Sequence, residues 1–301
     1  GGVMALMAST LISYGVAGLW QYAFLPVGRR LRLDWRTYRS GVAFSWRLFA
    51  NNLLGFVFQR ADTALVAWLM APIQVAYFEM GKRVPLLLSR ILVAGLVPFL
   101  PNISERVARN DLAGASRLLN QTVALFNVLV YTAALGIMLL AKPLITFLFS
   151  EKYLPCIPAI NFLLLSTALS LQAGITGQTL IALNRPGLVT KVNIGAAVVS
   201  VAANVVLIPD FGIQGAAMAA VLTYAFSTAL QSWLAFRNGM RLDLRAYVHP
   251  HLFMVVSVAI VWTTESAWLQ SGAIALFVGL CFATSTITLE HVKKLASAVR
   301  P

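Results

Sequence analysis

The chain has 301 residues, of which 59% are hydrophobic and only 11% are charged, and its mean hydropathy is +0.79. Soluble domains carry charge on about a quarter of their residues, so this balance excludes an ordinary soluble enzyme or binding domain. A net charge of +13 would suggest a nucleic-acid partner in a soluble protein. Here the basic residues fall in short loops between long apolar segments, which is typical of a polytopic membrane protein.

Nine apolar segments are predicted to be transmembrane helices, because each reaches the roughly 20 residues that a helix needs to cross a hydrocarbon core of about 30 Å. Helix is the expected state, since the backbone in lipid must satisfy its own hydrogen bonds and the segments lack the alternating polarity of barrel strands. In chain order, the predicted spans are residues 3–26, 41–70, 73–100, 121–144, 156–183, 188–208, 211–236, 250–268 and 270–290.

Alternate loops differ in positive charge. One set contains most of the 23 Lys and Arg residues, whereas the opposite set holds only Lys142 and Lys152. Because basic loops stay in the cytoplasm, the C-terminus is predicted to be cytoplasmic and the N-terminus external. The basic set consists of Arg29, Arg30, Arg32, Arg36, Arg39, Arg106, Arg109, Arg117, Arg185, Lys191, Arg237, Arg241, Arg245, Lys293, Lys294 and Arg300.

Ionisable residues inside two consecutive spans point most directly to function. A charge at mid-bilayer costs a few kcal/mol, so such side chains usually face a protein interior or a watery cavity. We expect Arg83 and Arg90, which share one helical face with Glu79, to contact an anionic ligand after Glu79 neutralises one cation. Arg47, beside Asn51 and Asn52, is the third candidate.

For the other charged residues of these two spans, a purely structural role is the alternative to ligand binding. Arg60, Asp62 and Lys82 are predicted to lie near the outer interface, where long side chains reach water and ion pairs absorb their charge.

Polar residues in later spans are predicted to serve mainly in helix packing, where amides and hydroxyls bond across helices. Thr176 and Thr179 share a face with Gln172, and Ser200 shares another with Asn204. Gln172 lies near the middle of its span and is therefore also a candidate cavity residue.

The sequence predicts no metal, cofactor or enzymatic activity. Cys156 and Cys281 are expected to be packing residues. The His249-Pro250-His251 run is interpreted as an interfacial turn entering a helix, because no further ligand lies near it. An integral-membrane glycosyl-lipid enzyme is the alternative, but the chain lacks an Asp-rich diphosphate motif, a nucleophile elbow and a phosphate-cradling Gly loop.

Several short motifs, taken in order, carry a family resemblance. They are an aromatic-Gly-Ile-x-Gly-Ala-Ala run at 211–217 after the break at 208–210, a tight turn at 182–186, the segments 62–65 and 75–80, and the stretches 98–101 and 104–106. From about residue 40 to residue 240 the chain resembles the C-terminal part of the polysaccharide transporters. These are the oligosaccharidyl-lipid flippases of the multidrug, oligosaccharidyl-lipid and polysaccharide exporter superfamily.

The resemblance implies an all-α membrane protein with two six-helix lobes. On that plan, residues 1–40 are the last helix of a truncated N-terminal lobe and a basic linker. Residues 41–240 form the complete C-terminal lobe, and residues 241–301 add a helix pair and a cytoplasmic tail. The chain is therefore expected to be N-terminally truncated.

The implied function is to flip a polyprenyl-diphosphate-linked oligosaccharide across the inner membrane by alternating access, for lipopolysaccharide or exopolysaccharide synthesis. Arg side chains suit a diphosphate because they offer fixed, multidentate donors. Asp62 and Glu79 are the candidates for ion coupling or ion pairing. The expected partners are membrane lipids, the lipid-linked substrate and the polymerisation machinery, and no nucleic acid.

Three alternatives remain at this stage. A drug or cation antiporter of the same superfamily is disfavoured because cations outnumber anions inside the spans. A peptidoglycan-precursor flippase has similar chemistry. A non-transporting membrane scaffold would not need Arg83 and Arg90 to face a cavity.

Overall fold

The computed structural model describes residues 2–24, 60–264 and 267–284, together with residues 35, 39 and 42. The chain divides into two compact units, Gly1–Gly55 and Phe56–Pro301. In the first unit, α1 (Gly2–Phe24) is a continuous helix, which confirms the first predicted helical segment. Arg47 lies outside the described residues, as do most of the basic linker and the C-terminal tail.

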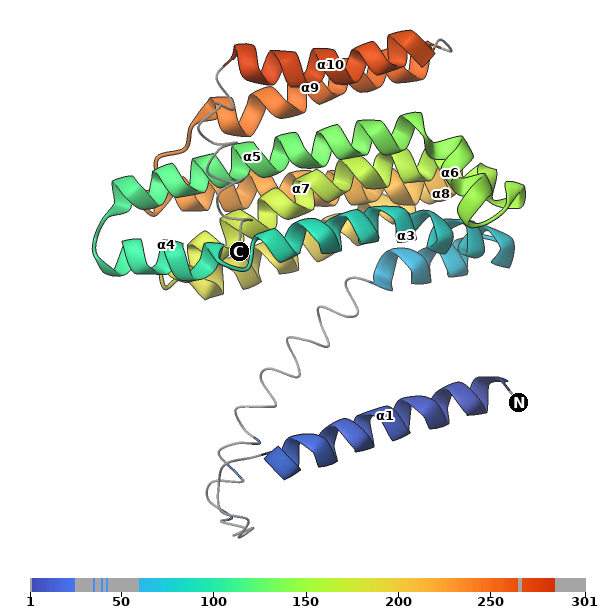
Figure 1. The fold of residues 1–301 in the computed structure, drawn as a ribbon, viewed down its shortest axis with the longest axis horizontal. Helices are drawn as coiled ribbons and strands as arrows, with labels where there is room; N and C mark the ends of the chain where they lie inside the picture. The colour runs from blue at the N-terminus through green and yellow to red at the C-terminus, as the bar shows by residue number, and fades with distance from the viewer. Residues whose placement is uncertain are drawn as a thin grey trace. The chain divides into compact units, whose positions relative to one another are not determined.

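The second unit is a bundle of long helices, which Figure 1 shows running alongside one another. Residues 60–69 are helical and are followed by α3 (Pro72–Gly95), α4 (Phe99–Ala108), α5 (Leu112–Leu139), α6 (Ala141–Leu148), the 3-10 helix η1 (Glu151–Cys156), α7 (Ile157–Ala182), α8 (Pro186–Arg237), α9 (Leu244–Thr263) and α10 (Ala267–Ala283). Four of the described helices are long and apolar enough to cross a membrane, or five if α3 and α4, bent by 42°, form one span.

The helix α8 contains the predicted tight turn between two spans. Its backbone is helical from Pro186 to Arg237 except at Gly212, where φ is 60° and ψ is −137°. A side chain on Gly215 would meet the Leu207 carbonyl oxygen at 2.1 Å, and one on Gly195 would meet the Phe226 ring at 3.2 Å. These pairs show that the two halves of α8 fold back on each other. Glycine is needed at 212 for its positive φ and at 215 for the close backbone approach.

The connection between the predicted spans 73–100 and 121–144 is largely helical, since α4 covers Phe99–Ala108 and α5 begins at Leu112, before the predicted span. The helix α4 buries Phe99 and Ile103 on one face. The helix α5 begins at Leu112 because the Asp111 carboxylate accepts a hydrogen bond from the Gly114 amide at 2.8 Å.

The helices α5 and α7 form the centre of the second unit. Their buried side chains, including Leu119, Leu135 and Leu164, make one large apolar cluster, and a smaller cluster surrounds the turn of α8. The pair α9 and α10 packs against α5, as Figure 1 shows. The region expected to be the transporter lobe and the additional helix pair are thus in direct contact.

Candidate functional site

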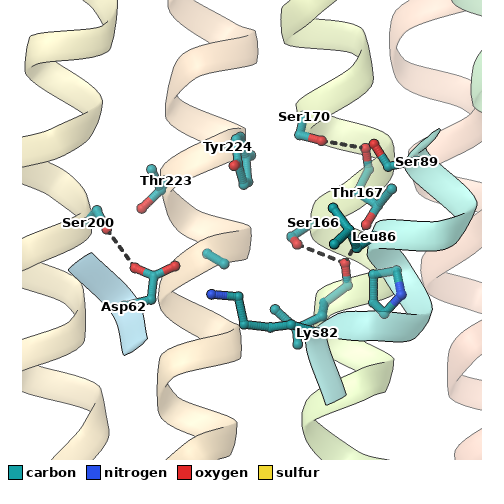
Figure 2. A pocket seen from close by; sticks show the side chains of 13 residues that line it. Asp62, Lys82, Leu86, Ser89, Ser166, Thr167, Ser170, Ser200, Thr223 and Tyr224 are labelled. Atoms are coloured by element: carbon teal, nitrogen blue, oxygen red, sulfur yellow. Dashed lines mark hydrogen bonds between the residues drawn. The ribbon is translucent and has the colours of Figure 1, made fainter. Parts of the chain in front are cut away.

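A polar pocket of about 340 Å³ lies between the helical residues 60–69, α3, α7 and both halves of α8. Ser200 in its wall lies about three helical turns before Gly212, which is roughly half of a membrane span. Figure 2 shows that its polar side chains come from segments far apart in the sequence. They are Asp62, Lys82, Ser89, Ser166, Thr167, Ser170, Ser200, Thr223 and Tyr224.

Among the described residues that line this pocket, Asp62 is the only carboxylate. One of its oxygens, Oδ1, accepts hydrogen bonds from Ser200 Oγ at 3.1 Å and from Asn204 Nδ2 at 3.0 Å. Ser200 and Asn204 are four residues apart and therefore lie on the same face of α8. Two neutral donors hold one side of the carboxylate, and among the described residues Oδ2 has no hydrogen-bond partner.

Glu79, on α3, is the second candidate carboxylate and lies in an ion-pair network. Its Oε1 accepts a hydrogen bond from Thr63 at 2.5 Å and lies 3.6 Å from Lys82 Nζ. Its Oε2 lies 3.7 Å from Arg60 Nη1. Glu79 thus pairs with Arg60 and Lys82, and none of the ion pairs among the described residues involves Arg83.

Lys82 connects this network to the pocket. Its ammonium group donates to Thr63 Oγ1 at 2.9 Å. It also interacts electrostatically with Asp62, toward which it points in Figure 2. The two carboxylates thus share one cation, but Glu79 has Arg60 as well, whereas Asp62 otherwise relies on uncharged donors.

Several hydroxyl groups in the pocket lining are available as acceptors. Ser166 and Thr167 each donate to the Leu163 carbonyl at 2.8 Å, and Thr223 donates to the Ala219 carbonyl at 2.8 Å. Each of these three hydroxyls has one proton, and because the helix backbone accepts it, only the lone pairs of the oxygen remain available. Together with the carboxylate, these oxygens suit a small cation or the hydroxyl groups of a sugar.

Arg83 and Arg90 lie on an exposed face of α3 and do not line the pocket. They are seven residues apart, and Leu86 lies between them on the same face and does line the pocket. Neither arginine has a carboxylate partner among the described residues. The structure therefore places both cations beside the pocket.

Gln172 belongs to a packed interface and not to the pocket. Its side chain is only 2% exposed, and its Oε1 accepts a hydrogen bond from Asn127 Nδ2 at 2.9 Å. Thr176 and Thr179 on the same helix donate to carbonyls of α7 itself. The packing interpretation fits this face better than the cavity interpretation of Gln172.

The His-Pro-His run lies within α9, so its interpretation as an interfacial turn is wrong. The helix begins one to two turns earlier, after Asp243, whose carboxylate accepts from the Arg245 amide at 3.0 Å. His251 Nδ1 lies 2.5 Å from Tyr131 Oη and so joins α9 to α5. Among the described residues, no three His, Cys, Asp or Glu side chains cluster as metal ligands.

Sequence reasoning missed most of the pocket. The spacing of Ser200 and Asn204 identified a shared face, but not the Asp62 carboxylate that this face binds. The hydroxyls of Ser166 and Ser170, also four residues apart, gave the same kind of signal and were not singled out.

Comparisons with known proteins agree with this architecture. The family model for polysaccharide biosynthesis proteins matches residues 1–158. The probable low-salt glycan biosynthesis flippase Agl15 of Haloferax volcanii is 22% identical over 293 residues, which cover 95% of this chain and 61% of that protein.

A solved structure gives the same fold. The lipid II flippase MurJ, in an inward closed conformation, matches with a TM-score of 0.65 at 12% sequence identity, over 85% of this chain and 56% of that one. The chain thus spans about three fifths of its curated relative. Together with the long apolar helices, these matches identify a multi-pass helical membrane protein.

Proposed function

The chain belongs to the polysaccharide biosynthesis protein family, and on that premise we propose that it flips a polyprenyl-diphosphate-linked oligosaccharide across the cytoplasmic membrane by alternating access. The relatives it matches are named as flippases and not as enzymes. The proposed assembly has two six-helix lobes, of which residues 41–240 form the C-terminal one.

The polar pocket is the observation that carries this proposal. It brings Asp62, Lys82 and a group of hydroxyl oxygens together about three helical turns from the turn of α8, and we infer from this spacing a position near the middle of the membrane. Polar groups at this depth are costly unless they face water or a ligand, so they are usually functional. Acceptor oxygens match the many hydroxyl donors of an oligosaccharide, which must cross the same depth.

The exposed arginines supply the charge that a diphosphate requires. Arg83 and Arg90 flank the pocket on α3 and have no carboxylate partner among the described residues. A guanidinium group donates several hydrogen bonds in a fixed plane and matches phosphate oxygens. We assign Arg83 and Arg90 to the diphosphate, and Arg47 remains a third candidate on sequence grounds alone.

The two carboxylates are proposed to have different roles. Glu79 is paired with Arg60 and Lys82, so its charge is already neutralised. Asp62 faces the pocket beside acceptor hydroxyls, which is a suitable arrangement for a coupling cation or proton. We therefore propose Asp62 as the coupling residue and Glu79 as a structural ion-pair partner.

Orientation and partners are proposed from the loop charges and the family. The C-terminus and the basic turns between α7 and α8 and after α8 are assigned to the cytoplasm. The product, a lipid-linked oligosaccharide in the outer leaflet, would pass to a polymerisation machinery for lipopolysaccharide or exopolysaccharide.

A liposome assay tests the proposal directly. The intact protein is reconstituted with a fluorescent polyprenyl-diphosphate oligosaccharide, and the fraction accessible to a membrane-impermeant quencher is followed over time. We expect wild-type protein to flip the lipid and Arg83→Gln and Arg90→Gln to lose most of the rate while still inserting. The matched control is Arg109→Gln, an exposed arginine at the end of α4 that pairs with Glu105 at 2.6 Å and does not line the pocket.

Two results would contradict the proposal. Equal rates in wild type and both α3 variants would make these arginines structural. No flipping by wild type, with uptake of cationic drugs in its place, would identify an antiporter.

A further inference from the structure

A second pocket has a volume of about 570 Å³. It lies at one end of the bundle, between the turn that connects α7 to α8 and the last residues of α8. Its lining includes the polar residues Asn184, Arg185, Lys191, Arg237 and Asn238. It shares no residue with the pocket around Asp62. No part of the proposed transport cycle requires it.

The fold brings the three cations of this pocket together. Asn184 has a positive φ of 58°, which reverses the chain directly after α7. The two halves of α8 fold back at Gly212, so the beginning and the end of this 52-residue helix lie at the same end of the bundle. Arg185 and Arg237 therefore line the same pocket although they are far apart in the sequence.

The described residues that line the pocket carry only positive charge. They include Arg185, Lys191 and Arg237 and no carboxylate. The four ion pairs found among the described residues involve other basic residues. Three like charges around one cavity repel one another, so an anion bound there would relieve this repulsion.

The apolar part of the pocket indicates what kind of anion fits. Leu188 and Leu234 are partly buried in its wall. Arg237 stacks on Trp233 with its guanidinium carbon 4.9 Å from the ring centroid, and Trp233 is half exposed. Tryptophan concentrates at the membrane interface, and this end of the bundle is the predicted cytoplasmic one. Cations above an apolar wall match a lipid with an anionic head.

We propose that this pocket binds the phosphate headgroup of an anionic membrane phospholipid at the cytoplasmic interface. Its two arginines donate to phosphate oxygens, Lys191 adds a third charge, and the leucines contact the start of the acyl chains. A bound lipid would fix the turn between α7 and α8 against the end of α8.

Native mass spectrometry of the intact protein in detergent tests this proposal. The protein is titrated with phosphatidylglycerol, with phosphatidylcholine as the net-neutral comparison and with inorganic phosphate as a competitor. We expect phosphatidylglycerol to bind preferentially, and the triple variant Arg185→Gln/Lys191→Gln/Arg237→Gln to bind it on the order of 100-fold more weakly, because each cation contributes about fivefold. The single variant Lys191→Gln is expected to bind about fivefold more weakly.

The matched control removes three charges from the same predicted side, outside the pocket. It is Arg109→Gln/Arg117→Gln/Arg245→Gln, and it is expected to bind phosphatidylglycerol like wild type. Equal weakening in both triple variants would show general surface electrostatics and overturn the proposal. If inorganic phosphate displaces the lipid at similar concentrations, the apolar wall contributes nothing and the lipid assignment fails. Because the readout is lipid binding, its outcome is independent of whether the protein flips a substrate.

Discussion

The pocket around Asp62 and the contacts between α5, α7 and α9 both contain polar side chains at membrane depth, but they are arranged in opposite ways. In the first region, oxygens face a cavity, and one carboxylate oxygen has no hydrogen-bond partner among the described residues. In the second, Asn127 donates to Gln172 and to the Ala246 carbonyl, and Tyr131 contacts His251. Polarity at mid-membrane therefore does not identify a site by itself.

The difference lies in what the polar groups face, which is a pocket in the first region and neighbouring helices in the second, where His251 Nε2 is also buried without a hydrogen-bond partner. Amides and hydroxyls that pair across helices contribute about 0.6 to 2 kcal/mol each and hold the helices in register. A carboxylate that faces a cavity receives fewer stabilising hydrogen bonds from the protein, so it remains available to bind a ligand or an ion. Substitutions in the first region should thus change transport, and substitutions in the second should change stability.

The largest effect is expected for Asp62→Asn. Asparagine keeps the size of the side chain and an oxygen that accepts from Ser200 and Asn204, but it removes the charge. We expect flipping to fall on the order of 100-fold, or about 2.7 kcal/mol in activation free energy. The measurement is the initial rate of quencher access in liposomes with an imposed ion gradient.

The control for this variant is Ser200→Ala, which removes one donor and keeps the carboxylate. Its rate should fall far less, and the thermal unfolding midpoints of the two variants should lie near that of wild type. If the Asp62→Asn protein is fully active, Asp62 has only a structural role, and the two regions do not differ in their contribution to transport.

The opposite behaviour is expected for Asn127→Leu. This substitution leaves the Gln172 amide oxygen buried without its donor, which costs about 1 to 3 kcal/mol of stability. Flipping by the folded fraction should stay at the wild-type rate. Thermal unfolding in detergent measures the loss, and the double variant Asn127→Leu/Gln172→Leu should recover part of it because neither partner is then left unsatisfied. A rate loss as large as that of Asp62→Asn would show that this interface belongs to the transport machinery.

The helical segments and the turn of α8 follow from local sequence, which explains why they were predictable. The run from Phe211 to Ala217 contains a glycine for a positive φ and a second glycine for a close approach, and both requirements are local. The helical stretch at 101–120 was missed because α4 is amphipathic and too short to be read as a span. The helix α4 ends where Asn110 takes a positive φ of 58°, and Asp111 then caps the start of α5.

The pocket was less predictable because it depends on pairings between distant segments. Asp62 bonds to Ser200 and Asn204 across more than a hundred residues, and helical periodicity does not identify such a partner. Periodicity did place Arg83 and Arg90 on one face of α3. It gave no information on whether that face turns into the pocket or lies beside it.

A smaller effect is expected for Glu79→Gln, which compares the two carboxylates directly. Glutamine still accepts from Thr63 but no longer pairs with Arg60 and Lys82. Because the Glu79 side chain is 38% exposed, those pairs contribute at most about 1 kcal/mol. We expect the flipping rate to fall less than about tenfold, measured beside Asp62→Asn under the same gradient. If Glu79→Gln lowers the flipping rate more than Asp62→Asn does, Glu79 is the coupling residue and Asp62 is the structural partner.

The smallest effect is expected for Tyr131→Phe, which removes only the hydroxyl that contacts His251. The ring remains and keeps its edge-to-face packing on Phe277, with centroids 5.9 Å apart, so α10 stays in place. Hydrogen bonds between transmembrane helices contribute about 0.6 kcal/mol on average, and we expect a loss of that order in thermal stability with no change in flipping. A double-mutant cycle with His251→Phe isolates the contact. A coupling energy near zero would mean that apolar packing alone holds α9 against α5, whereas a loss of transport in Tyr131→Phe would make the α9 contact part of the moving machinery.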